Sequence, residues 1–236
     1  MKERLIKMAL SNYDITRDNA EQRFLNYDQK KMIEKFHLKH DEQYLYTEFV
    51  GRDYRINRSL GRIEWTEDGF THVEHAGFNE VLAICDALCD SKEDCRLSGR
   101  FMKVNDLKGT VRSSGLGNDL YRKYAEYFDG RLPALRKACE TLGGERQMIG
   151  DVSYLLHPFS FLPLMLQFWE SDDEFPASLK LMWDENTLDF LRYETTYYVL
   201  GHVLERLKTL MEEDGKGTIQ KSYNAAMRQP FDMYTK

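Results

Sequence analysis

The stretch of residues 164–184, LMLQFWESDDEFPASLKLMWD, places two alternating apolar runs on either side of a short acidic segment. Large apolar side chains recur at every second position: Leu164, Leu166 and Phe168 in the first run, and Leu179, Leu181 and Trp183 in the second. Because the side chains of a strand alternate between its two faces, each run predicts a strand with one apolar face. We therefore expect residues 162–169 and 178–183 to pair as an antiparallel hairpin.

Size and charge narrow the class of protein. The chain has 236 residues, of which 42% are hydrophobic, enough for one large domain or two small ones with a core. The formal net charge of −6 argues against a general nucleic-acid binder, whose phosphate contacts need a basic face. No apolar run approaches the roughly 20 residues that span a bilayer. The first residues, MKERLIKMALSNYD, are charged and lack a long apolar core, so we expect a cytoplasmic protein with no membrane segment.

Periodicity along the chain predicts an α+β fold, with antiparallel strands and hairpins and with helices packed mainly on one face. Helical spacing of apolar residues is found at 19–36, 78–89, 119–128, 132–142 and 187–211. Alternation, or enrichment in β-branched and aromatic residues, indicates further strands at 44–50, 54–58, 61–66 and 147–155. We expect residues 1–213 to form a single domain and 214–236 to be a loosely packed or disordered tail.

The segment between the two apolar runs concentrates negative charge. Four carboxylates lie within five residues: Glu170, Asp172, Asp173 and Glu174. Crowded carboxylates repel one another, so at least one pKa rises unless an arginine, a lysine or a metal neutralises them. Their oxygens suit calcium or magnesium, although the segment is too short, and lacks the glycine, for an EF-hand loop. The alternative, which is the usual outcome for a charge run, is a solvated hairpin turn.

Phe175 and Pro176 close the acidic segment. An ordinary solvated turn has no need of an aromatic–proline closure. We therefore expect Phe175 to be buried, and at least one of three carboxylates to point inward to a backbone amide, an arginine or a helix start. These three residues are Asp172, Asp173 and Glu174.

A second pair of carboxylates follows the hairpin. Glu194 lies in the helix predicted at 187–211, with Leu191 and Tyr198 at helical spacing, so its carboxylate should lie near the edge of the buried face. A polar group left unsatisfied there costs about 1–3 kcal/mol. Asp184 ends the second strand and can reach the same region. We expect the two residues to anchor the junction between hairpin and helix, and a direct ligand contact is the alternative.

Cysteine and histidine provide weak candidates for metal ligands. Cys85, Cys89 and Cys95 give the spacing C-x3-C-x5-C, which matches neither the common zinc pattern nor the common ferredoxin pattern. The alternative is that Cys85 and Cys89 are small buried side chains on the apolar face of a helix. His72 and His75 can ligate a metal if they lie at a strand end, and surface positions near a turn are the alternative.

Residues spread over the second half of the chain carry a resemblance to a known family. They are Gly143-Gly144, Gly150-Asp151, Pro163-Leu164, Trp169, the run DDEFPA at 172–177, Asp184, Leu191 and Glu194. Together they resemble the core of the domain of unknown function 3786 family, most strongly over residues 132–207. The resemblance implies no established activity. It implies an origin mainly in anaerobic bacteria and archaea and, through relatives joined to iron–sulfur-binding domains, a link to redox, corrinoid or other metallocofactor metabolism. This chain has no CxxC-type cluster motif.

Three functions are compatible with these features. The first is an accessory protein of anaerobic metabolism that binds a small molecule or metallocofactor in an aromatic-lined pocket. The residues expected to contact this ligand are Asp151, Trp169, Asp172, Asp173, Glu174 and Glu194. The second is a metal-dependent enzyme that uses Asp151, Asp173 and Glu194 as acid, base or ligands. The third is a protein-interaction module or homodimer, suggested by the 14 tyrosines.

Overall fold

The computed structural model describes residues 12–110 and 118–214, so the tail predicted at 214–236 lies, after Asp214, outside the described residues. The described chain contains α-helices and two antiparallel sheets. The helices are α1 (Asn12–Phe24), α2 (Gln29–Phe36), α3 (Phe78–Cys85), α4 (Asn118–Phe128), α5 (Leu132–Thr141) and α6 (Tyr193–Asp214). The predicted α+β fold class is therefore confirmed.

The first sheet is built from consecutive strands in the order β1-β2-β3-β4-β5. They are β1 (Lys39–His40), β2 (Tyr44–Phe49), β3 (Arg52–Asn57), β4 (Ile63–Thr66) and β5 (Glu74–His75). The strands predicted at 44–50, 54–58 and 61–66 are confirmed to within two residues at each end. Cross-strand partners such as Leu45 and Ile56 are both buried, which explains why the alternation of side chains revealed these strands.

The second sheet has the order β6-β10-β9-β8-β7. Its strands are β6 (Phe101–Met102), β7 (Glu145–Arg146), β8 (Val152–Phe159), β9 (Leu162–Trp169) and β10 (Ser178–Asp184). The predicted hairpin is confirmed as β9 and β10, in a register that places Leu181 opposite Leu166 and Trp183 opposite Leu164. All four side chains are buried, as the period of two requires.

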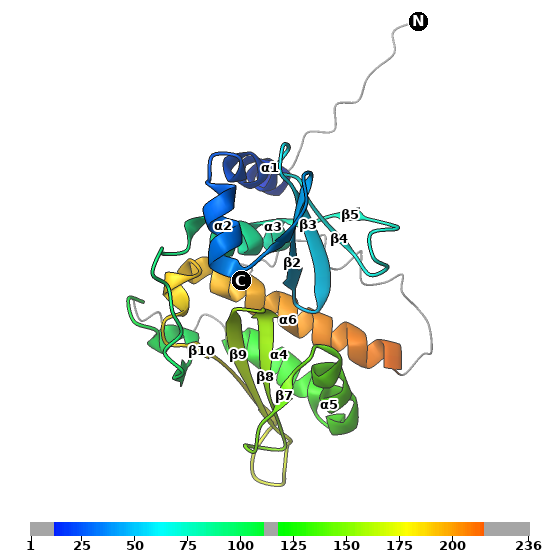
Figure 1. Ribbon diagram of the computed structural model, residues 1–236. Coiled ribbons are helices and arrows are strands. Elements are labelled where there is room, and N and C mark those ends of the chain that lie inside the picture. Colours follow the sequence, from blue (N-terminus) through cyan, green and yellow to red (C-terminus); the bar gives the residue numbers. More distant parts are fainter. Residues whose placement is uncertain (1–11, 111–117, 215–236) are drawn as a thin grey trace, which may run out of the picture.

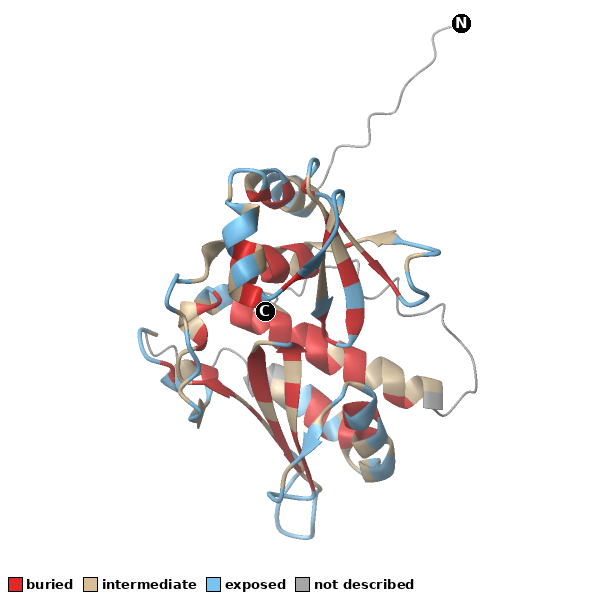
Figure 2. Ribbon diagram, in the orientation of Figure 1, coloured by how far each residue is buried: buried red, intermediate tan, exposed pale blue. Residues whose placement is uncertain are grey.

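Helix α6 runs between the two sheets, and both sheets help to bury it (Figure 1). Its His202 ring lies 4.9 Å from the Phe49 ring of β2, and Phe49 lies 4.8 Å from Phe159 of β8. The Val50 amide donates to the Pro158 carbonyl at 2.9 Å, which joins the ends of the two sheets directly. Figure 2 shows the buried residues concentrated along α6 and on the strand faces turned toward it.

The single helix predicted at 19–36 is wrong, because the chain turns between α1 and α2. Asp28 caps α2: its carboxylate accepts the amides of Lys30 and Lys31 at 3.0 and 3.2 Å. An aspartate satisfies the free amides of a first helical turn and so starts a new helix. The apolar spacing continued across this turn and hid the break.

Two further helix predictions are corrected in detail. The helix predicted at 187–211 is a short 3-10 turn, Thr187–Asp189, followed after a break by α6. Phe190 and Leu191 are buried at this break, and the Phe190 ring stacks 6.1 Å from Phe161, so packing redirects the chain. The helix predicted at 78–89 is α3 continued by a π-helical turn, Asp86–Asp90.

Candidate ligand-binding site at the acidic end of the second sheet

Three chain segments meet where β9 ends: the β9–β10 loop, the β7–β8 loop and the corner between α4 and α5. Asp151 accepts the Glu170 amide at 2.8 Å, which ties the first two segments together. Asp129 accepts the Ser171 amide at 3.0 Å and the Ser171 hydroxyl at 2.7 Å. The Gly130 amide donates to the Glu170 carboxylate at 3.1 Å. These bonds fix the base of the acidic loop against two neighbouring segments.

The outer part of the acidic loop is held by Asp172. Its carboxylate accepts the amides of Glu174 and Phe175 at 2.9 and 2.7 Å, and its own amide donates to the Phe175 carbonyl at 3.0 Å. Asp172 bonds backbone amides as expected, but the expectation that a carboxylate of this run points inward is wrong for Asp172, because it is exposed and these amides belong to its own turn. The expected burial of Phe175 is wrong, because 66% of it is exposed. Asp172 closes the turn by itself, so the aromatic ring is not needed for closure.

The remaining charges of the loop are not compensated. Asp173 and Glu174 are exposed, and within the described chain their carboxylates make neither a hydrogen bond nor an ion pair. Hydrogen bonds from the Ser171 hydroxyl and amide hold the pKa of Asp129 below its usual value. Asp129 therefore stays negative, because its donors are neutral groups that stabilise the charge without cancelling it.

Trp169 and Asp151 lie at the base of this end of the sheet. The Trp169 side chain is half-buried, and the Lys180 ammonium of β10 lies 4.3 Å from the ring centre. Gly150 passes so close to this edge that an added Cβ would lie 2.7 Å from the Phe168 carbonyl and 3.1 Å from the Trp169 ring. The sequence-predicted residues from Asp151 to Glu174 are therefore brought together at one end of the sheet.

A groove of about 340 Å³ opens beside the acidic loop. Its lining residues come from α4 and from the far side of the loop and the start of β10: Tyr121, Arg122, Ala125, Glu126, Asp129, Ser171, Pro176, Ala177, Ser178 and Leu179. The sequence interpretation did not assign these residues to a site. The signal present in the sequence was the amphipathic pattern of α4, which alone predicts only core packing.

Tyr121 is one of the residues that line this groove. Its hydroxyl is buried and makes no hydrogen bond within the described chain. Burial raises the pKa of Tyr121, so the phenol remains a neutral donor. A buried hydroxyl without a partner is an unmet hydrogen bond inside the protein.

Glu194 is not part of this site. It is exposed in the first turn of α6, whereas the acidic loop lies at the other end of β10 (Figure 1). The expectation that Glu194 lies at a buried edge is wrong, because the break at residues 190–192 turns it to solvent. Asp184 is fully buried and makes its bonds at this junction without Glu194. It accepts the amides of Ser98, Gly99 and Asn186 at 2.8–3.0 Å.

Among the described residues, the cysteines do not form a cluster with other metal-ligating side chains. Cys85 is buried and its thiol donates to the Ala20 carbonyl at 3.7 Å, as a small core side chain does. Its contact with Cys89 is the main cause, and burial the second cause, of a raised pKa of the Cys85 thiol. Burial likewise raises the pKa of Cys95. Over residues 12–110 and 118–214, no three His, Cys, Asp or Glu side chains are placed to hold a metal ion.

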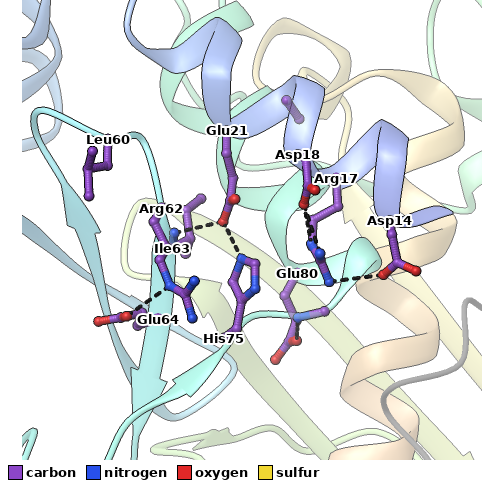
Figure 3. Close-up of polar contacts among 12 residues, drawn as sticks. Asp14, Arg17, Asp18, Glu21, Leu60, Arg62, Ile63, Glu64, His75 and Glu80 are labelled. Atoms are coloured by element: carbon purple, nitrogen blue, oxygen red, sulfur yellow. Dashed lines mark hydrogen bonds and ion pairs between the residues drawn. The ribbon is translucent and has the colours of Figure 1, made fainter. Parts of the chain in front are cut away.

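The two candidate histidines bond to different carboxylates. His72 is exposed, and its Nδ1 lies 2.6 Å from Asp68. His75 Nε2 lies 2.8 Å from Glu21 of α1, which also accepts the Ile63 amide at 2.8 Å (Figure 3). Glu21 is buried and joins α1 to two strands of the first sheet. His75 therefore forms part of a packing contact between elements.

A polar cluster that the sequence did not reveal surrounds the π-helical turn. Asp86 and Asp90 lie one helical turn apart and share two arginines from other elements. Arg23 of α1 lies 2.9 Å from Asp90 and 3.8 Å from Asp86, and Arg192 lies 2.6 and 3.7 Å from the same two carboxylates. Two positive charges thus balance two negative charges, as expected for a junction that joins three segments.

Burial sets the ionisation of Asp86 in this cluster. The pKa of its carboxyl is raised chiefly by burial, against the opposing effects of the Thr195 hydroxyl and Arg192. Tyr27 donates to Asp90, which raises the pKa of Tyr27 to about 12. Every carboxylate of the cluster has partners, so we assign it to stability and not to ligand binding.

No helix in the described part of the chain has the length and apolar character needed to cross a membrane. Comparisons with curated proteins and with solved structures found no match. A family model described as "Domain of unknown function (DUF3786)" matches residues 28–206. The match begins at the residue that caps α2 and takes in both sheets and most of α6. It is wider than the region 132–207 that carried the resemblance. The chain therefore belongs to the family of domain of unknown function 3786.

Proposed function

We propose that this protein is an accessory binding protein that holds a small amphipathic cation in the groove between α4 and the β9–β10 loop. The observation that carries the proposal is the groove itself, together with the negative charge along one side of it. Its volume of about 340 Å³ falls in the range of small-molecule sites, which are concave and mostly apolar with a few polar groups.

The walls of the groove divide into an apolar part and a charged part, which holds the two carboxylates of Asp129 and Glu126 and the guanidinium of Arg122. Ala125, Ala177 and Leu179 offer an apolar surface for the body of a ligand. Asp129 keeps its negative charge, and Glu126 adds a second carboxylate that Arg122 approaches only to 4.0 Å. A ligand with a positive group would meet this edge favourably, and an anion would be repelled.

The acidic loop strengthens this preference. Asp173 and Glu174 lie in the loop that supplies one wall of the groove, and they carry no compensating cation within residues 118–214. The negative field they add favours the approach of cations and falls off over about 10 Å in ordinary salt. Ligand affinity should therefore decrease as ionic strength rises.

The test uses three probes of similar shape and different charge: phenethylamine, phenethyl alcohol and hydrocinnamate. Binding is measured by protein-observed NMR shifts and by the shift in melting temperature. We expect phenethylamine to bind at least about tenfold more tightly than hydrocinnamate, a difference of about 1.4 kcal/mol. Equal binding of the three probes, or resonance shifts away from α4 and the loop, would reject the proposal.

A matched pair of variants locates the binding. Ala177→Leu places a larger side chain into the groove and should abolish the phenethylamine shift. Ala134→Leu changes another half-buried alanine that packs against the core outside the groove, and it should leave binding unchanged.

The four cysteines are thiols, in keeping with a reducing compartment, and we place this activity in the cytoplasm.

A further inference from the structure

Large apolar side chains are exposed at the same end of the second sheet, on the loops that carry the acidic run. Met148 and Ile149 of the β7–β8 loop are 92% and 49% exposed, and Phe175 of the β9–β10 loop is 66% exposed. We call residues 148–151 and 170–176 the tip. Exposed apolar groups that gather at one place, rimmed by polar residues, mark interaction surfaces.

The two loops of the tip are held side by side. Asp151 accepts the Glu170 amide, and Gly150 lies against the Trp169 ring, so the loop bearing Met148 packs on the base of the loop bearing Phe175. Asp172 fixes the outer turn through two amides. The apolar groups are thus presented on a frame that is already ordered, which lowers the entropy lost on binding.

The charge of the tip selects its partner. Asp173 and Glu174 directly precede Phe175 and carry carboxylates that no described residue neutralises, and Asp172 is bonded only by neutral amides. An apolar contact ringed by negative charge complements an apolar contact ringed by positive charge. An anionic lipid surface would be repelled by the same carboxylates.

We propose that the tip is a docking surface for a protein segment in which apolar side chains are flanked by lysine or arginine. Met148 and Phe175 would supply the apolar contacts, and Asp173 and Glu174 would pair with the basic flanks. Ser171 and Pro176 of the tip line the groove, but Met148, Ile149 and Phe175 do not, so the apolar contacts of the tip lie outside the small-molecule site.

Three fluorescent peptides test the proposal by anisotropy on the full-length protein: two leucines flanked by lysines, the same leucines flanked by glutamates, and two serines flanked by lysines. We expect only the first peptide to bind. Met148→Ser and Phe175→Ser should each weaken it at least about fivefold, as hot-spot contacts do. The double change of Asp173→Asn with Glu174→Gln should weaken binding and flatten its salt dependence.

Leu60→Ser is the matched control, because Leu60 is 60% exposed in the turn between β3 and β4, far along the chain from the tip. It should bind the peptide like the unaltered protein. Met148→Ser and Phe175→Ser change residues that do not line the groove, so both variants should still bind phenethylamine, and failure of this proposal and failure of the groove proposal can be told apart.

Four results would overturn the docking proposal. One is binding of all three peptides alike, and another is binding that Met148→Ser and Phe175→Ser leave unchanged. A third is association with neutral phosphatidylcholine vesicles that these two changes abolish, which would assign the tip to membranes. The fourth is a dimer in sedimentation that the same changes dissociate, which would assign the tip to a second copy of the chain.

Discussion

The carboxylates of this protein behave differently in its interior and at its tip. Glu80, Asp86 and Asp184 are buried, and each accepts hydrogen bonds from a different part of the chain. Glu80, for example, accepts the Tyr54 hydroxyl at 2.5 Å. At the tip, Asp172 bonds only its own turn, and Asp173 and Glu174 bond nothing in the described chain.

The difference separates residues that hold the fold from residues that are free for another use. A buried carboxylate is tolerated only when donors and cations compensate for the water it has lost. A carboxylate without partners on an exposed turn contributes little to stability, and crowding it with like charges is mildly unfavourable. The composition of the tip is therefore not explained by folding, and stability measurements can test this contrast.

The largest loss of stability is expected at Gly61, where the backbone of α1 leaves no space for a side chain. Gly61 has a φ of +74°, and an added Cβ would lie 2.0 Å from the Glu21 carbonyl. Figure 3 shows this contact region between α1 and β4. Gly61→Ala should lower the free energy of unfolding by about 3 kcal/mol, through backbone strain and displacement of α1.

Gly69 provides the control for this change, because it has a φ of +67° and no atom within 4 Å of an added Cβ. Gly69→Ala should lower stability by only about 1 kcal/mol, the contribution of backbone strain. Equal losses for the two variants in urea unfolding would show that the contact with Glu21 has no importance.

The next effect concerns the buried anchor of the hairpin. Asp184→Asn keeps one acceptor oxygen for the amides of Ser98, Gly99 and Asn186 and loses the charge that strengthens these bonds. We expect a loss of about 2 kcal/mol by urea unfolding. Glu194→Gln, at an exposed position, should change stability by less than about 0.5 kcal/mol. A larger loss for Glu194→Gln than for Asp184→Asn would reverse our assignment.

A smaller effect should appear in the pH dependence of stability. Burial raises the pKa of Asp86 in the folded state, so folding favours its protonated form. Its contribution is most favourable below the ordinary aspartate pKa of about 4, and it declines as pH rises through the raised pKa. Asp86→Asn should remove this decline from urea-unfolding data collected between pH 4 and 8.

For Asp68 we expect the opposite dependence of stability on pH. Hydrogen bonds from the His72 amide and ring hold the pKa of Asp68 below its usual value. Its stabilising contribution is present above the unfolded pKa and is lost as pH falls through the folded one. Asp68→Asn should therefore reduce the loss of stability on acidification. If Asp86→Asn and Asp68→Asn changed the pH dependence of the free energy of unfolding in the same direction, the contrast between these two aspartates would be contradicted.

The smallest effects are expected at the tip. Phe175→Ser and Asp173→Asn remove an exposed ring and an unpaired charge, so each should change the free energy of unfolding by less than about 0.5 kcal/mol. Thermal and urea unfolding both provide the measurement. A loss above about 1 kcal/mol for either variant would mean that the tip stabilises the fold. Its composition would then be explained by stability, without a binding function.

Sequence reasoning succeeded where one face of an element is buried along its whole length. The hairpin of β9 and β10 is such a case, because a period of two in large apolar residues shows which face of each strand is buried and rules out a slip by one residue. It failed at the breaks near Asp28 and Phe190, where apolar spacing continues while the chain changes direction. Capping and local packing decide these positions, and a periodicity pattern does not record them.

None of the residues predicted to contact a ligand lines the groove, and the sequence prediction reached only the loop beside it. The acidic loop was found because its charges are adjacent in sequence, and Asp151 joined it through the bond to Glu170. The wall formed by α4 was missed, because Ala125 and Tyr121 look like any residues of a core-facing helix. Their place in a groove depends on how α4 packs against β10, which is a contact between residues distant in sequence.

The position of α6 between the two sheets has a consequence during protein synthesis. The first sheet ends at His75, whereas the helix that packs on it through Phe49 is complete only at Asp214. At ordinary translation rates the ribosome needs roughly 10 seconds to make the intervening chain. For that interval the apolar residues that await α6 remain uncovered on the nascent chain, and they are suitable binding sites for chaperones that act at the ribosome.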